Sequence, residues 1–293
     1  MKKKVIAPSE LIINEDGSVF HLHLKPEQLA SNVVLVGDPK RVDLVASYFN
    51  NQEFRVENRE FRSITGTYSG KRITVLSTGI GCDNIDIVMN ELDALVNVNF
   101  ESRTPKSELT SLNIVRVGTC GGLQANCPVG TFVISEASIG FDGLLNFYAN
   151  RESIVEADIE SAFIAHMNWT NTRLGAHPYI VMANEDLTQR IAQSDMVRGL
   201  TIACPGFYGP QGRVIRLPLA DEMQNEKIMS FDYRGKKITN FEMESSALAG
   251  LSKLLGHKAT TVCMVIANRV AHDVNTNYTN SIEKLIQNVL MRI

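Results

Sequence analysis

The sequence lacks the features that mark secreted, membrane-spanning and nucleotide-cofactor proteins. Its five cysteines are odd in number, far apart and form no C-x-x-C pair, which indicates neither a disulfide framework nor a zinc motif. No apolar run approaches the roughly 18 residues that span a bilayer. Val5-Ile6-Ala7 is too short for the apolar core of a signal peptide. The phosphate-binding patterns G-x-G-x-x-G and G-x-x-x-x-G-K-[ST] are also missing. We therefore expect a cytoplasmic protein.

An excess of charge of one sign is missing as well. Asp and Glu total 32 against 29 Lys and Arg, a net charge of −3, and nucleic-acid surfaces need clustered basic residues. Among the six histidines, only His21 and His23 stand close together. Their H-x-H spacing suits a metal site on a strand, but no third ligand is evident. We expect no metal, no other cofactor and no nucleic-acid partner.

What is present is the composition of an ordinary globular protein. Of its 293 residues, 44% are hydrophobic, which suits one large α/β domain with a sizeable core. Apolar runs typical of buried strands alternate with helical patterns. We expect strands at 32–36, 62–68, 71–77, 113–117, 131–139, 237–241 and 260–267, and helices at 39–49, 85–96, 152–167, 244–255 and 281–291. Asp83 is the expected N-cap of the second helix. This order predicts an α/β fold with a mostly parallel sheet between helices.

Two segments interrupt this alternation. Residues 97–111 (NVNFESRTPKSELTS) are polar and contain a proline, which predicts a surface insertion. Residues 1–19 precede the first clear element and form an arm that either packs on a neighbouring subunit or frays. The rest of the chain, 20–293, is expected to be a single domain.

Glycine turns and arginines together suggest an anion site. Three turns, at 37–39, 78–81 and 118–122, follow expected strands, where α/β proteins bind ligands and glycine lets backbone N–H groups approach an anion. Arg41 lies one helical turn beyond Gly37, and Arg116 ends an apolar strand beside Thr119. Arginine binds phosphate in a bidentate manner, so we expect a site for free phosphate. The alternatives are tight turns alone and a structural salt bridge of Arg116.

Two further segments carry polar groups next to expected elements. Glu242-Met243-Glu244 lies between a strand and a helix, where the carboxylates suit the vicinal hydroxyls of a sugar and the methionine its apolar face. The alternative is that Glu244 caps the helix. Phe207, Gln211 and Arg213 lie in the loop CPGFYGPQGR and suit a planar ring with carbonyl and N–H edges, unless the loop is merely solvated.

These segments resemble the nucleoside phosphorylases of the uridine phosphorylase group. Eight motifs occur in order from Phe20 almost to the C-terminus: FHLHL (20–24), VGDPKRV (36–42), NREF (58–61), STGIG (77–81), RVGTCGGL (116–123), FYGPQGR (207–213), NFEMES (240–245) and VIANR (265–269). The resemblance implies one three-layer α/β domain with a central mixed, barrel-like sheet. It also implies assemblies of dimers, typically hexamers, with active sites shared across the dimer interface.

The resemblance also implies a role for each matched residue. Gly37, Arg41, Arg116 and Thr119 would bind phosphate, with Arg59 reaching in from the partner subunit. Met243 and Glu244 would hold the ribose 2′- and 3′-hydroxyls, with His21 of the partner subunit at the 5′-hydroxyl. Gln211 and Arg213 would read the uracil edge, and Phe207 and Ile266 would pack on its ring. The implied reaction converts uridine and phosphate to uracil and ribose 1-phosphate.

The chain departs from the family pattern at three places, one of which is the insertion at 97–111, where related bacterial enzymes usually turn tightly. The loop reads GPQGR where relatives often have Pro-Gly before the glutamine. Cys82-Asp83-Asn84 stands where the bacterial pattern has a serine at a monovalent-cation site, although Glu60 matches that site. The alternatives of the same fold are a nucleosidase, which would use water, and a purine nucleoside phosphorylase. The purine enzymes typically have an Asp after the late strand, where this chain has Ile266-Ala267-Asn268-Arg269. A non-catalytic nucleoside-binding protein is the alternative from another class.

Overall fold

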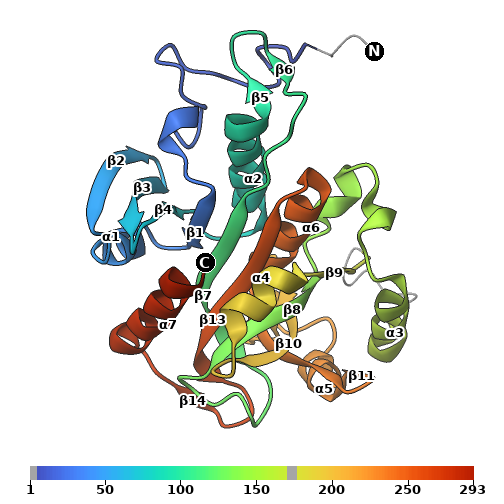
Figure 1. Ribbon diagram of the computed structural model, residues 1–293. Coiled ribbons are helices and arrows are strands. Elements are labelled where there is room, and N and C mark those ends of the chain that lie inside the picture. Colours follow the sequence, from blue (N-terminus) through green and yellow to red (C-terminus); the bar gives the residue numbers. More distant parts are fainter. Residues whose placement is uncertain (1–4, 170–176) are drawn as a thin grey trace.

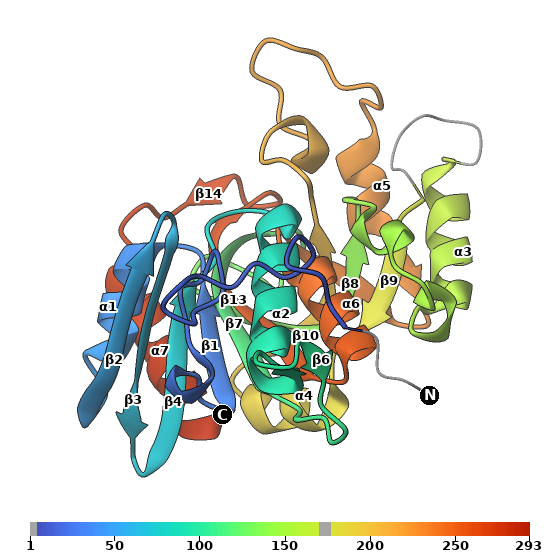
Figure 2. The ribbon, with the colours of Figure 1, turned by 90° about the horizontal axis from the view of Figure 1, so that it is seen from above.

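The computed structural model of the chain describes residues 5–169 and 177–293. It is a three-layer α/β structure in which helices cover both sides of a large mixed sheet (Figures 1 and 2). The strands are β1 (Asn32–Val36), β2 (Asn51–Asn58), β3 (Phe61–Tyr68), β4 (Lys71–Ser77), β5 (Val98–Asn99), β6 (Thr104–Pro105), β7 (Asn113–Gly122), β8 (Phe132–Gly140), β9 (Tyr179–Met182), β10 (Val197–Ala203), β11 (Asp232–Tyr233), β12 (Lys236–Glu242), β13 (Lys258–Asn268) and β14 (Asp273–Val274). The helices are α1 (Pro39–Ala46), α2 (Cys82–Asn97), α3 (Ala157–Met167), α4 (Glu185–Ala192), α5 (Gln224–Ser230), α6 (Ser245–Leu255) and α7 (Thr279–Arg292).

Five strands of this sheet close into a small barrel. β7 pairs with β13, β13 with β8, β8 with β10 and β10 with β12. β12 then pairs back with β7 through Asn240 and Phe241, opposite Gly122 and Gly121. β1, β4, β3 and β2 extend the sheet outward from β7. This mixed, barrel-like sheet between helices is the predicted fold.

The helical layers follow from the alternation of side chains along the central strands. Val33 and Leu35 of β1 join a buried cluster with α2 and α6. Val34 and Val36 point the other way and join a cluster with α1, α4 and α7. Both faces of β1 are covered, and the strand is apolar from Val33 to Val36, as is usual in parallel sheets. Among the described residues, no helix is long and apolar enough to cross a membrane.

Several predicted boundaries are wrong by a few residues. Helix α1 ends at Ala46 rather than at 49, and α3 begins at Ala157 because 151–153 form a separate 3₁₀ turn. Helix α2 begins at Cys82, and Gly81 occupies the cap position with φ 104°, so the prediction of Asp83 as N-cap is wrong. That conformation favours glycine, and it allows the chain to turn sharply from β4 into the helix.

The arm and the insertion lie side by side in the same chain (Figure 1). Strands β5 and β6 form a small hairpin within 97–111. The backbone N–H of Ile6 donates to the carbonyl of Arg103 (2.8 Å). The Arg103 guanidinium donates in return to the carbonyls of Ile6 (2.8 Å), Ala7 (3.1 Å) and Leu11. The described part of the arm is therefore fastened to the insertion by main-chain contacts.

Candidate active site

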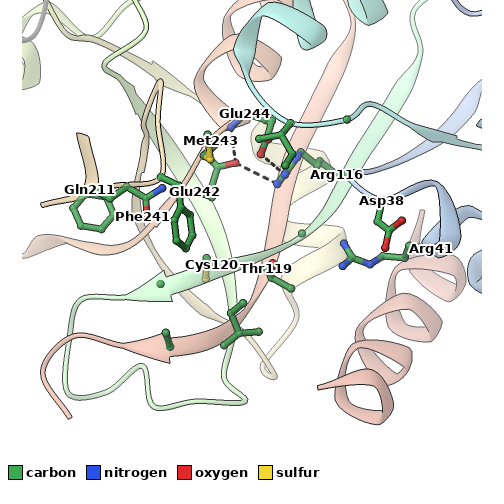
Figure 3. Close-up of a pocket in the computed structure, with 18 of the residues that line it drawn as sticks. Asp38, Arg41, Arg116, Thr119, Cys120, Gln211, Phe241, Glu242, Met243 and Glu244 are labelled. Atoms are coloured by element: carbon green, nitrogen blue, oxygen red, sulfur yellow. Dashed lines mark hydrogen bonds and ion pairs between the residues drawn. The ribbon is translucent and has the colours of Figure 1, made fainter. Parts of the chain in front are cut away.

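A cavity of about 750 Å³ opens where β1, β4, β7, β12 and β13 end (Figure 3). All the residues predicted to bind phosphate, ribose or base line it, except His21 and Arg59. They are Gly37, Arg41, Arg116, Thr119, Met243, Glu244, Phe207, Gln211, Arg213 and Ile266. Figure 3 shows Arg41 and Gln211 on opposite sides of the cavity, with Arg116, Glu242 and Glu244 between them.

Arg116 is the most deeply fixed charge of the cavity. Its side chain is 6% exposed and forms ion pairs with Glu242 (3.2 Å) and Glu244. Burial by itself would lower the pKa of Arg116, but the charges of Glu244 and Glu242 more than offset it and raise the pKa above its usual value. Arg116 is therefore held as a cation, and the salt bridge considered as an alternative is present in this structure, within the cavity itself.

Glu242 connects Arg116 to the start of α6. Its carboxylate accepts from the backbone N–H groups of Glu244 (2.9 Å) and Ser245 (3.0 Å), and from the Ser245 hydroxyl (2.6 Å). The capping role considered for Glu244 thus belongs to Glu242, because the Glu244 side chain makes no cap bond. Burial raises the pKa of the Glu242 carboxyl, against the opposing charge of Arg116. The Glu242 carboxylate, expected together with that of Glu244 at the hydroxyls of a sugar, is thus engaged by Arg116 and by the start of the helix.

Glu244 links the helix to the turn after β4. Its second carboxylate oxygen accepts from the backbone N–H of Gly81 (2.8 Å). Gly79, two residues earlier, has φ 69°, and a Cβ there would lie 2.5 Å from the Asn84 side chain. The turn therefore requires glycine. Gly79 also donates its N–H to the carbonyl of Gly37 (3.1 Å), which joins the two glycine turns at one wall of the cavity.

Arg41 lies at the same wall, one helical turn into α1. It donates to the carbonyl of Val117 (3.4 Å) and forms no ion pair with any residue that the structure describes. Burial lowers the pKa of Arg41. The positive charge of Arg116 lowers it further, by a smaller amount. Arg41 is half-buried, and a partly buried guanidinium without a carboxylate favours an anionic ligand. Thr119 and Asp38 line the same region, and Asp38 caps α1 by accepting from Lys40 (2.9 Å).

The opposite end of the cavity is formed by the loop after β10. The Arg213 guanidinium lies 3.7 Å from the centre of the Phe207 ring and donates to the side-chain oxygen of Gln211 (2.6 Å). Arg269 donates to the backbone carbonyl of Gln211 (3.1 Å). Burial and the charge of Arg269 lower the pKa of Arg213 to about 10, so Arg213 stays cationic at neutral pH. Ile266 of β13 and Val274 of β14 also line the cavity.

His21 and Arg59 lie together outside this chain's cavity. The Arg59 guanidinium is 5.7 Å from the Phe20 ring, and the Asn58 amide donates to the His21 carbonyl (2.8 Å). Nδ1 of His21 lies 2.7 Å from the carboxylate of Glu91. Glu60, which follows Arg59 in the chain, packs beside the Gly79 turn. A Cβ on Gly79 would lie 3.3 Å from the Cγ of Glu60.

Other residues line the cavity without having been assigned an individual role, although several belong to the predicted glycine turns and Glu242 belongs to the Glu242-Met243-Glu244 segment. They are Asp38, Pro39, Gly79, Ile80, Gly118, Cys120, Gly121, Phe241, Glu242, Ala267 and Val274. Most are direct neighbours of predicted residues, so the motifs that contain them were the available signal. Val274 is different, because only the pairing of β14 with β13 brings it to the cavity. Among the described residues, no group of three or more His, Cys, Asp or Glu side chains is placed to hold a metal ion.

Known proteins resemble this chain over most of its length. Residues 32–293 match the phosphorylase superfamily. The chain is 30% identical to a uridine phosphorylase of Thermococcus kodakarensis over 265 residues, 88% of this chain and 80% of that protein. It is 26% identical to a guanosine phosphorylase of Halorubrum lacusprofundi over 86% of this chain and 84% of that protein. A Trypanosoma brucei nucleoside phosphorylase, described as showing uridine phosphorylase activity, superposes with a TM-score of 0.86 at 29% identity, covering 97% of this chain and 100% of that one. The chain belongs to the phosphorylase superfamily.

Proposed function

We propose that the protein is a nucleoside phosphorylase and that its nucleoside is uridine. The observation that carries this proposal is a single cavity with Arg41 at one end, a half-buried cation that forms no ion pair with the described residues, and the Gln211–Arg213 pair at the other. Met243 and Glu244 lie between the two ends. A cavity of about 750 Å³ is within the range that holds a nucleoside-sized ligand together with a small anion.

At the phosphate end, Arg41, Arg116 and Thr119 would hold the dianion beside the Gly37 turn. Arg116 would then contact phosphate while it remains paired with Glu244, whose carboxylate would accept from the ribose 2′- and 3′-hydroxyls. Holding the nucleophile and the sugar in one geometry lowers the barrier, and proximity contributes roughly 7–11 kcal/mol in well-oriented systems. The phosphate itself supplies the nucleophile, so no covalent intermediate on the protein is required.

At the base end, negative charge would gather on uracil as the glycosidic bond breaks. Arg213 offers only donors, and the Gln211 amide both donates and accepts, so the pair matches a carbonyl, an N–H and a second carbonyl in sequence. Phe207 and Ile266 would pack on the ring. Fixed donors aimed at developing charge stabilise the transition state more than the substrate.

A second copy of the chain would complete each site. We propose that His21 and Arg59 reach the ribose 5′-hydroxyl and the phosphate of the partner's cavity, in a homo-hexamer built of three dimers. This accounts for two motif residues that lie side by side, outside their own chain's cavity.

A purine nucleoside is the competing substrate, since one relative is a guanosine phosphorylase. Purine cleavage benefits from an acid that protonates the leaving base. After β13, this chain has Asn268, whose side chain is buried on main-chain groups and does not line the cavity. We therefore favour uridine.

Initial rates of base release from uridine and from inosine, each with and without phosphate, test the proposal. We expect uracil release that depends on phosphate and runs well ahead of inosine cleavage. Phosphate-independent release would indicate a nucleosidase, and faster inosine cleavage would indicate a purine enzyme. Binding without turnover of either nucleoside would indicate a non-catalytic protein.

A further inference from the structure

Asn268 ends β13 behind the base end of the cavity and uses every hydrogen-bonding group of its side chain. Its Nδ2 donates to the carbonyls of Gln124 (3.0 Å) and Cys127 (2.7 Å). Its Oδ1 accepts from the backbone N–H groups of Val270 (2.9 Å) and Ala271 (2.8 Å). An amide has two donor hydrogens and two acceptor lone pairs, and Asn268 is only 3% exposed. The side chain is therefore saturated.

These four bonds join segments that form the base end. The bonds to Val270 and Ala271 close the turn into β14, and Val274 of β14 pairs with Ala267 while lining the cavity. The bond to Gln124 reaches further, because the Gln124 side chain donates to the carbonyl of Ile238 in β12 (2.9 Å). Asn268 thus ties the ends of β13 and β14 to the loop after β7.

Arg269, the residue after Asn268, links Asn268 to the loop that contains Gln211 and Arg213. Arg269 donates its backbone N–H to the carbonyl of Gly122 (3.0 Å) and its guanidinium to the carbonyl of Gln211 (3.1 Å). Gly122 leaves room for the amide, since a Cβ there would lie 3.0 Å from the Asn268 Nδ2 and 2.7 Å from the Cys127 carbonyl. A shift of Asn268 would move Arg269 and, with it, Gln211.

We propose that Asn268 is the positioning residue that fixes this cavity for a pyrimidine base. The inference rests on the proposed phosphorolysis of uridine and adds why the chain holds no acid at this point. A neutral carboxyl group donates one hydrogen and a carboxylate none. Either form leaves a carbonyl of Gln124 or Cys127 facing an oxygen at hydrogen-bond distance, which is costly for buried groups. The main chain therefore demands an amide here. Without an acid here, negative charge on the leaving base has to be stabilised by Gln211 and Arg213. Their groups suit the carbonyl and N–H edge of a pyrimidine.

The test compares Asn268→Asp and Asn268→Ala with the wild type and with Asn51→Asp, an exposed asparagine on the edge strand β2. We expect the KM for uridine to rise about tenfold or more in both Asn268 variants, because Asn268→Ala loses all four bonds and Asn268→Asp loses at least one of the two donated by Nδ2. The KM for phosphate should stay within about threefold, and Asn268→Asp should not cleave inosine. Asn51→Asp should match the wild type.

A merely structural role would instead reduce the active fraction and kcat while leaving both KM values unchanged. Three results would each overturn the proposal. They are that pattern, an unchanged KM for uridine in the Asn268 variants, and inosine cleavage by Asn268→Asp. If both Asn268 variants fail to fold, Gly122→Ala decides, because it crowds the amide without removing it. In Gly122→Ala we expect the KM for uridine to rise about tenfold while the KM for phosphate stays within about threefold. An unchanged KM for uridine in this variant counts against the proposal. The wild-type arm tests the proposed function separately: inosine cleaved as fast as uridine would reject uridine specificity whatever the variants do.

Discussion

The two ends of the cavity are built in different ways. The phosphate and ribose end consists of buried charges: Arg116, which lies within β7 and not at the strand end predicted for it, pairs with Glu242 and Glu244. The base end consists of a loop that projects from the body of the molecule (Figure 2), where Phe207 is 50% exposed. Charges fixed to a sheet keep their geometry without a ligand, whereas a loop can adjust to one. The first end should therefore tolerate substitution poorly and the second more readily.

The largest effect is expected at the buried end. Arg116→Ala should lower kcat/KM for both uridine and phosphate about 10²-fold or more, because it removes a donor placed to stabilise charge. It should also lower the melting temperature, since Glu242 and Glu244 would remain buried without their partner. Steady-state kinetics on the folded fraction measure the first effect, and thermal unfolding measures the second.

Arg41→Ala separates these two effects, because Arg41 forms no ion pair with the described residues. It should weaken phosphate binding with little change in melting temperature. Wild-type kinetics in folded Arg116→Ala would remove Arg116 from the phosphate site. An equal loss of stability in both variants would contradict the contrast drawn between the two arginines.

At the base end, Gln211→Ala should raise the KM for uridine by roughly 10-fold to 100-fold, because each buried polar group of the base left unpaired costs about 1–3 kcal/mol. The KM for phosphate should hardly change, since Arg41 and Arg116 lie across the cavity. Competition with cytidine sharpens the test. Cytosine presents an amino donor to these donors and should bind poorly to the wild type, with less discrimination in the variant.

The patch that contains His21 and Arg59 allows a test of whether two subunits share each active site. Arg59→Ala and Arg116→Ala subunits are each expected to be inactive alone. After equal mixing and exchange between dimers, about a quarter of the sites carry neither lesion, because each hybrid dimer of a shared-site pair keeps one intact site. Activity should recover to about that fraction. Confirmed exchange with no recovered activity would argue against shared sites.

The smallest effect is expected from Arg269→Ala. The variant loses the 3.1 Å bond to the Gln211 carbonyl, and one such bond contributes about 1 kcal/mol. We expect the KM for uridine to rise a few-fold and the melting temperature to change little. A loss as large as that of Arg116→Ala would show that the base end is as rigid as the phosphate end.

The sequence predicts the buried end better than the loop end. Apolar strands that end in glycine are readable patterns, so β1 and the turns holding Gly37 and Gly79 were placed correctly. Strands β2 and β10 were not predicted. β2 (NQEFRVEN) is largely exposed and polar, and β10 (VRGLTIA) contains a glycine that lets Thr239 of β12 approach. Neither carries the apolar signal that the prediction used.

Contacts that depend on tertiary pairing could not be read from the chain. That Glu242 rather than Glu244 caps α6 follows from which carboxylate faces the helix start. The link from Arg269 to Gln211 joins residues 58 positions apart. The saturation of Asn268 depends on the packing of three segments. Spacing along the sequence holds none of this information.

The central claim is that phosphate at one end of the cavity displaces uracil held at the other. The most direct measurement follows both products of the wild-type protein from uridine, uracil by absorbance and ribose 1-phosphate by phosphorus NMR, as phosphate is raised from zero. We predict equal amounts of the two products and no uracil without phosphate. Uracil release that does not depend on phosphate, or that yields free ribose in place of ribose 1-phosphate, would contradict the account.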